Sequence, residues 1–105
     1  MAHRYRFTSP LWIWEASGEG AWHFVTLPED AADEIKAIVD GTVRRGFGSV
    51  RVEATVGPTT WRTSIFPSKE SGSYVLPMKK AVRTAAAVGE GDDVDVELEL
   101  LLEGS

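Results

Sequence analysis

The sequence predicts a mainly β domain with two short helices, a barrel or sandwich built from two related halves. The prediction rests on a repeat, because the pair Leu27-Pro28 returns at Leu76-Pro77, 49 positions later (76 minus 27). Each pair follows a short apolar strand and precedes a helix-like run and then a strand with alternating apolar residues. The half-repeats cover approximately residues 21–56 and 73–102.

Length and composition favour one small globular domain over residues 1–105. Hydrophobic residues make up 43% of the chain and charged residues 26%, which is ordinary for a folded domain. No cysteine is present, which excludes disulfides, thiolate metal sites and cysteine nucleophiles, and two distant histidines make a zinc site unexpected. With no signal-like or membrane-length apolar run, we expect a cytoplasmic protein without cofactor, metal or membrane contact.

The first half predicts a hairpin followed by a helix. Arg4–Trp14 has the pattern of a strand in which Pro10 marks an edge, a bulge or a break, and residues 17–20 form a turn before the strand Ala21–Leu27. Pro28 suits the first helical position, with two carboxylates in the first turn. The helix ends at Asp40-Gly41, and its apolar face consists of Ala31, Ala32, Ile35, Ile38 and Val39.

The second half predicts another hairpin, a strand, a helix and a final strand. Strands Val50–Val56 and Thr60–Phe66 flank the turn Gly57-Pro58-Thr59, and a polar loop leads to the short strand Tyr74–Leu76. A helix over Met78–Val88 follows, with a buried stripe formed by Met78, Ala81, Val82 and Ala85.

The last strand alternates apolar and acidic residues, so it has one buried and one wet face. From Glu90 onward the chain has seven acids and no base, whereas the net charge of the whole chain is −5. This acidity disfavours broad nucleic-acid binding. Because the carboxylates would repel one another, we expect the first and last strands to be neighbours, with Arg4, Arg6 and Arg51 as the available cross-strand partners.

Four stretches together resemble a bacterial and archaeal family, the domain of unknown function numbered nineteen-hundred-and-five. They are Gly20–Pro28, Trp61–Pro67, Tyr74–Arg83 and Gly91–Val96, in an order that covers nearly the whole chain. The resemblance implies a double-split β-barrel, a pseudo-barrel capped by helices. Members occur alone or beside a domain associated with bacteriocin protection, and no activity is established for the family as a whole.

A Leu-Pro pair, a helix with Lys and Arg, a Gly-Asp pair and an alternating Val strand are also similar to AbrB- and MazE-type transcription factors. Those proteins form intertwined dimers on DNA, so the resemblance implies that this chain holds two such halves in one polypeptide. DNA binding is not carried over, because the first helix has Glu29, Asp30, Asp33 and Glu34 where bases would be needed.

Cations at the start of the second helix indicate a candidate anion site. Lys79 and Lys80 stand where the helix macrodipole disfavours positive charge, and a broken local rule often marks function. We expect a pocket for phosphate or carboxylate, with Trp61 or another Trp as a wall. The alternative is that these bases pair with the acidic strand and solvent. The candidate ligand-binding residues are Arg62, Ser64, Lys79, Arg83, Trp61 and Lys80.

The remaining aromatic and titratable residues leave two questions open. Trp12 and Trp14 lie on one strand face, and if exposed they would suggest a ligand or dimer surface on a chain that is a monomer or a homodimer. His23 is interpreted as a strand-face residue hydrogen-bonded to a neighbour. It is also the base that a Ser64 nucleophile would need, but no catalytic motif supports an enzyme.

The sequence therefore predicts a binding module for a small anionic or mixed apolar-anionic ligand. One alternative is an AbrB-like or stress or bacteriocin-protection accessory protein that acts through protein or DNA contacts. Another is a small enzyme that uses the barrel pocket.

Overall fold

The computed structural model describes residues 3–16, 20–40 and 48–101, which form six strands and two helices. The predicted turn at residues 17–20 lies largely outside the described residues, and so does Gly41 at the predicted end of the first helix. In chain order the elements are β1 (Arg4–Ala16), β2 (Gly20–Thr26), α1 (Glu29–Asp40), β3 (Val50–Val56), β4 (Thr59–Ser68), β5 (Ser73–Pro77), α2 (Lys80–Ala86) and β6 (Asp93–Leu100).

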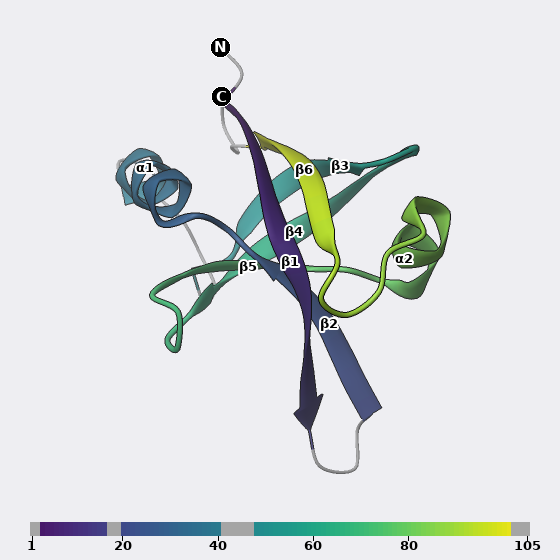
Figure 1. The fold of residues 1–105 in the computed structure, drawn as a ribbon. Coiled ribbons are helices and arrows are strands. Elements are labelled where there is room, and N and C mark those ends of the chain that lie inside the picture. Colours follow the sequence, from purple (N-terminus) through teal and green to yellow (C-terminus); the bar gives the residue numbers. More distant parts are fainter. Residues whose placement is uncertain (1–2, 17–19, 41–47, 102–105) are drawn as a thin grey trace.

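The six strands close into an antiparallel barrel in the order β1-β2-β5-β4-β3-β6, with α1 and α2 on opposite sides (Figure 1). The predicted fold class, mainly β with two short helices, is confirmed. Exchanging β1, β2 and β3 for β4, β5 and β6 leaves the cyclic strand order unchanged. Duplication of one structural unit, with halves at 21–56 and 73–102, stays a prediction.

β1 runs unbroken through Pro10 because the strand changes its partner there. Residues 4–10 pair with β6, and residues 11–16 pair with β2. The backbone of Leu11 still faces β6, donating to the Asp92 carbonyl (2.9 Å) and accepting from the Gly91 amide (2.8 Å). By alternation, Pro10 faces the other side before the pairing with β2 begins, so its missing N–H removes no ladder hydrogen bond.

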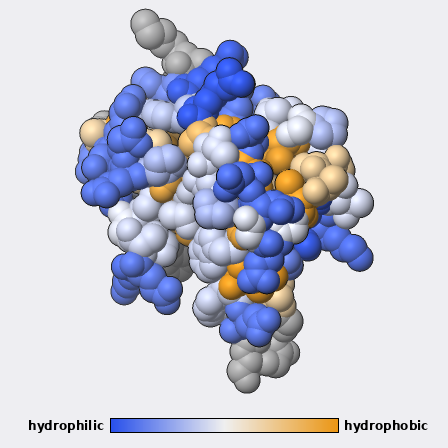
Figure 2. Space-filling model, in the orientation of Figure 1, coloured by the Kyte–Doolittle hydropathy of each residue, from blue (hydrophilic) through white to orange (hydrophobic). Residues whose placement is uncertain are grey.

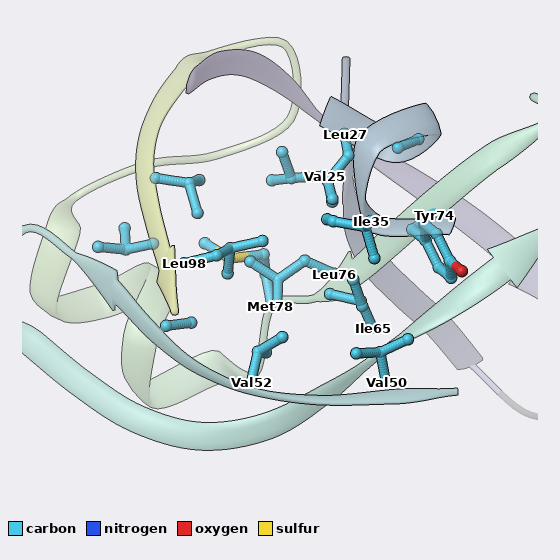
Figure 3. Packing of buried hydrophobic residues seen from close by; sticks show 14 of the residues in the cluster. Val25, Leu27, Ile35, Val50, Val52, Ile65, Tyr74, Leu76, Met78 and Leu98 are labelled. Atoms are coloured by element: carbon cyan, nitrogen blue, oxygen red, sulfur yellow. The ribbon is translucent and has the colours of Figure 1, made fainter. Parts of the chain in front are cut away.

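The barrel interior and α1 share one hydrophobic core (Figure 3). Leu98, Leu76 and Ile65 are fully buried from three strands, and each such side chain contributes about 1.5–3 kcal/mol. The predicted apolar face of α1 is confirmed at its centre, where Ala32, Ile35 and Val39 are buried, while Ala31 and Ile38 are half-buried.

α1 begins one residue later than predicted, because Pro28 precedes the helix and is not its first residue. The Pro28 carbonyl accepts the Ala32 amide (3.0 Å), so Pro28 is the N-cap residue and Glu29 the first helical position. Oδ1 of Asp30 accepts a hydrogen bond from the Ala31 amide (2.9 Å). Nζ of Lys36 donates to the Gly72 carbonyl (3.0 Å). The Lys36 contact ties the helix to the loop before β5.

The prediction for the second helix is wrong at both ends, and its buried stripe is confirmed only at Met78 and Val82. α2 covers Lys80–Ala86, and of the four stripe residues Met78 lies before the helix while Ala81 and Ala85 are exposed. Val82 is buried, and Ala86 packs against the core. The chain stays extended past Pro77 because the Met78 amide donates to the His23 carbonyl (2.8 Å). A left-handed residue, Ala87 (φ 57°), ends the helix.

The acidic strand β6 lies beside β1, as predicted. Arg4 pairs with Glu99 at 3.2 Å and Arg6 with Glu97 at 3.6 Å, while Val94, Val96, Leu98 and Leu100 alternate inward. Glu53 of β3 stands directly opposite Glu99. Glu53 pairs with Arg62 of β4 at 3.6 Å. The expected pairing of Arg51 with an acid of β6 is not among the described ion pairs.

The face of the molecule in Figure 2 is mostly hydrophilic, as the charged ladder of β1 and β6 requires. Among the described elements, neither helix is long and apolar enough to cross a bilayer.

Candidate functional site: a cationic pocket where β5 ends

The candidate site lies in a gap between β2 and β4. β5 separates these strands only where it pairs with Phe24–Thr26 of β2 and Phe66–Ser68 of β4. Past Pro77 the chain leaves the sheet and crosses into α2, while β2 and β4 run on without a strand between them. The gap holds a pocket of about 290 Å³.

The pocket lining is cationic and aromatic. Among the described residues it contains Arg62, Lys79 and Arg83 and no carboxylate, although acids outnumber bases by 16 to 11 in the whole chain. The full lining consists of Ala21, Trp22, His23, Trp61, Arg62, Thr63, Pro77, Met78, Lys79 and Arg83. Four residues that the sequence predicts as ligand-binding therefore meet here, namely Trp61, Arg62, Lys79 and Arg83.

Arg83 joins α2 to β2 across the pocket floor. Its Nε donates to the Met78 carbonyl at 3.0 Å, and its Nη1 lies 3.3 Å from Nε2 of His23. Because a guanidinium has donors only, Nε2 of His23 must accept, which places the proton of the neutral ring on Nδ1. The sequence interpretation of His23 as a residue hydrogen-bonded to a neighbour agrees with this contact.

The surroundings of His23 keep its ring neutral. Burial lowers the pKa of His23 below its usual value of 6.5, and the positive charge of Arg83 lowers it further, while Glu90 acts in the opposite direction. A neutral ring is the form that accepts from Arg83, so the pKa shift and the hydrogen bond agree.

Arg62 is held only loosely at the pocket wall. Its Nε lies 3.6 Å from Oε2 of Glu53, and the two side chains are 69% and 37% exposed. Exposed pairs of this kind contribute about 0–1 kcal/mol, so a ligand can compete for the guanidinium. The sequence left open the alternative that these bases pair with the acidic last strand. Arg62 does pair with an acid, but that acid lies on β3.

Lys79 is the N-cap residue of α2, and its backbone carbonyl accepts from Val82 and Arg83 (both 3.1 Å). Its side chain is exposed and makes no capping hydrogen bond. α2 has seven residues, about two turns, so the positive potential of the pocket comes from side chains more than from a helix dipole.

Ser64 and Lys80 do not line the pocket. Ser64 follows Arg62 on the outward face of β4, where its register partner is Arg51. Lys80 is exposed at the start of α2. A pairing of Ser64 with His23 as nucleophile and base gains no support, because the imidazole Nε2 contacts Arg83 and Ser64 lies outside the pocket.

Sequence reasoning missed the part of the lining that comes from β2 and from the turn between β5 and α2. Ala21 and Met78 carry no chemical signal, and Pro77 is recognisable only as a helix-start proline, whereas it ends β5. Trp22 fits the expected aromatic wall. The role of His23 depends on Arg83, 60 residues further along the chain.

A second, larger hollow of about 460 Å³ lies over the charged ladder, lined by residues of β1, β3 and β6. Its charged groups already have partners within the hollow, since Arg6 pairs with Glu97 and the Asp95 carboxylate accepts from the Thr8 hydroxyl. It is the weaker candidate. Within residues 3–16, 20–40 and 48–101, no group of three or more potential metal ligands is present.

Comparison with known proteins places the fold in a family. Residues 7–98 match the model of the family described as Domain of unknown function (DUF1905). None of the curated proteins matches the chain. Because the matched residues reach from β1 to β6, this protein belongs to the DUF1905 family.

Proposed function

We propose that the protein binds a small ligand that combines an anionic group with a flat apolar part. The observation that carries the proposal is the lining of the pocket at the end of β5, whose described residues include three cations and no carboxylate in a chain of net charge −5. Lysine and arginine donors are the groups that proteins use to hold carboxylate and phosphate oxygens.

The arrangement divides the pocket into two parts. Arg62 and Lys79 supply exposed cationic groups, while Arg83 is bound to Met78 and His23. Trp22 and Trp61 supply aromatic surface. A volume of about 290 Å³ is near the lower end of the range for small-molecule sites, which favours a ligand of one ring and one anionic group.

Adjacent lysines offer a matched test. Lys79 lines the pocket and Lys80 does not, although both are exposed and stand next to each other. Phenyl phosphate serves as the probe in isothermal titration calorimetry, with benzyl alcohol as the uncharged comparison and inorganic phosphate as the comparison without a ring. Lys79→Ala should weaken phenyl phosphate binding about tenfold or more, because a charge-assisted hydrogen bond contributes about 1.5–3 kcal/mol.

Lys80→Ala should bind the probe as the wild type does, and both variants should keep the wild-type melting temperature. Arg62→Ala should also weaken binding. Equal effects of Lys79→Ala and Lys80→Ala would contradict the proposal, as would benzyl alcohol binding as tightly as phenyl phosphate.

An accessory role through DNA contacts is a weaker proposal. Its support is the similarity to AbrB- and MazE-type barrels together with the cations around α2, whereas β6 presents Asp93, Asp95, Glu97 and Glu99 on its outward face. If the protein has this role, it should shift duplex DNA in a gel mobility assay. The affinity for DNA should fall steeply between 50 and 200 mM salt, because a DNA-binding protein makes about six or more phosphate contacts. Absence of such a shift would exclude it.

A further inference from the structure

A second surface of the barrel has an unusual composition. The side chains of β1 after Pro10, of β2, of β5 and of the end of β4 alternate between the core and the outside, with Leu11, Val25, Leu76 and Ile65 directed inward. The outward positions between them form what we call the outer aromatic face. Its described members are Trp12, Trp14, Trp22, Phe24, Thr26, Ser64, Phe66, Ser68, Ser73, Val75 and Pro77.

The most exposed large hydrophobic side chains of the described residues all belong to this face. Trp14, Trp22 and Phe66 are 49%, 50% and 43% exposed. Trp14 and Trp22 are direct cross-strand partners, and Trp22 stacks on Phe24 with ring centroids 6.5 Å apart. Phe66 is separated from Trp14 and Trp22 by β5, whose outward side chains Ser73 and Val75 are buried. Clustered exposed aromatic side chains mark an interaction site more often than scattered single residues do.

The aromatic rings are held in place. Trp12 lies 5.1 Å from Phe24 between ring centroids, and its Nε1 donates to Oγ1 of Thr26 at 2.8 Å. Although Trp12 and Trp14 lie on one strand face, they do not share one degree of burial, because Trp12 is half-buried by these contacts while Trp14 is exposed. A preformed aromatic surface loses little side-chain entropy when it is covered.

Charge distribution identifies the occupant of this face. None of its described members is charged, although charged residues make up 26% of the chain. In the ring of six strands, β5 at the centre of the face lies opposite β6, which carries the outward acids. Two copies that meet through this face therefore place their acidic strands on the far sides of the assembly, where a net charge of −5 each repels least.

We propose that the outer aromatic face is a homodimer interface, in which two copies pack sheet against sheet around a twofold axis. Two apolar sheet faces pack with interdigitating side chains about 10 Å apart, and a twofold contact uses the same surface of both copies. A nucleic acid or a strongly charged peptide would meet cations only at the edge of the face, where Trp22 and Pro77 border the cationic pocket.

The size of the face sets the strength of the dimer. Four strands with about five to seven residues each cover roughly 400 Å² in projection. The accessible surface area of the face is larger than its projected area because side chains protrude from it, but it does not exceed the roughly 800 Å² per partner of a standard interface. An interface of this size predicts an exchanging dimer whose population depends on concentration, rather than a permanent one.

Sedimentation equilibrium over a concentration series tests the proposal. The wild type should move from 11.5 kDa toward twice that mass as concentration rises to about 1 mM. The double variant Trp14→Lys/Phe66→Lys should weaken the dimer by at least about thirtyfold, because a central aromatic contributes that factor or more. Trp22 is left intact, since it also lines the cationic pocket.

Ala37→Lys/Ala85→Lys is the matched control, because it adds the same charge at exposed positions of α1 and α2. It should associate as the wild type does. Phe66→Ser is a milder second variant that retains all four tryptophans, so a concentration-dependent blue shift of tryptophan emission should be present in the wild type and weaker in this variant. A wild type that stays at 11.5 kDa over the whole series, or equal weakening in both double variants, would overturn the proposal.

Discussion

The bridge from Arg83 to His23 and Met78 gives the most detailed prediction, Arg83→Ala. The substitution removes the hydrogen bond from Nε to the Met78 carbonyl at 3.0 Å and the contact of Nη1 with His23 at 3.3 Å. Both contacts are part-buried, so the two acceptors regain some water in the variant. Charged donors contribute up to about 3 kcal/mol when fully buried, and we therefore expect a loss of about 1–2 kcal/mol in the free energy of unfolding.

Urea unfolding followed by circular dichroism measures this loss. For a domain of this size, about 1–2 kcal/mol corresponds to a fall of roughly 5–15 °C in melting temperature. Lys80→Ala on the same helix is the control and should change stability by less than about 0.5 kcal/mol, because Lys80 is exposed. The loss should also be smaller in a His23→Ala background, since one acceptor is already absent. An Arg83→Ala variant as stable as the wild type would refute the bridge.

Three further predictions concern stability. Ala87→Gly should raise the free energy of unfolding by about 0.5–1 kcal/mol in urea titrations, because Ala87 has a left-handed φ of 57°; a loss would contradict this backbone. Leu76→Ala should cost about 2–5 kcal/mol by the same assay, because Leu76 is fully buried; a cost below 1 kcal/mol would be inconsistent with that burial. The pKa of His23 in the folded protein is below 6.5. The neutral His23 ring therefore contributes fully to the free energy of unfolding above about pH 6.5, and this contribution is lost as pH falls through the folded pKa. His23→Gln should remove this part of the pH dependence between pH 8 and 5, and parallel stability curves for variant and wild type would exclude it.

Strand positions and the neighbours of the acidic strand could be predicted from sequence because each depends on a local pattern. The alternation of Val94 to Leu100 defines a strand with one wet face, and its repelling carboxylates demand a basic neighbour. Arg4 and Arg6 meet that demand in the structure. The third expected partner, Arg51, could not be decided in this way, because its place depends on the pairing of β3 with β4, where Arg51 stands opposite Ser64.

The start of the second helix and the form of the site could not be predicted, because both depend on contacts between distant segments. Pro77 has the sequence signature of a helix start, but hydrogen bonding of the Met78 amide to β2 keeps the chain extended there. The same contact leaves the gap between β2 and β4. Spacing along β4 placed Ser64 with Arg62, whereas the pocket lies at the edge of that strand and includes Thr63.

A titration of ¹⁵N-labelled protein with phenyl phosphate, followed by chemical-shift changes, tests the central claim most directly. The account predicts that the changes concentrate on the amides of His23, Thr63 and Lys79 and on the indole N–H groups of Trp22 and Trp61, all of which line the pocket. Changes that concentrate on Trp14 and Phe66 of the outer aromatic face, or no change at millimolar probe, would contradict it.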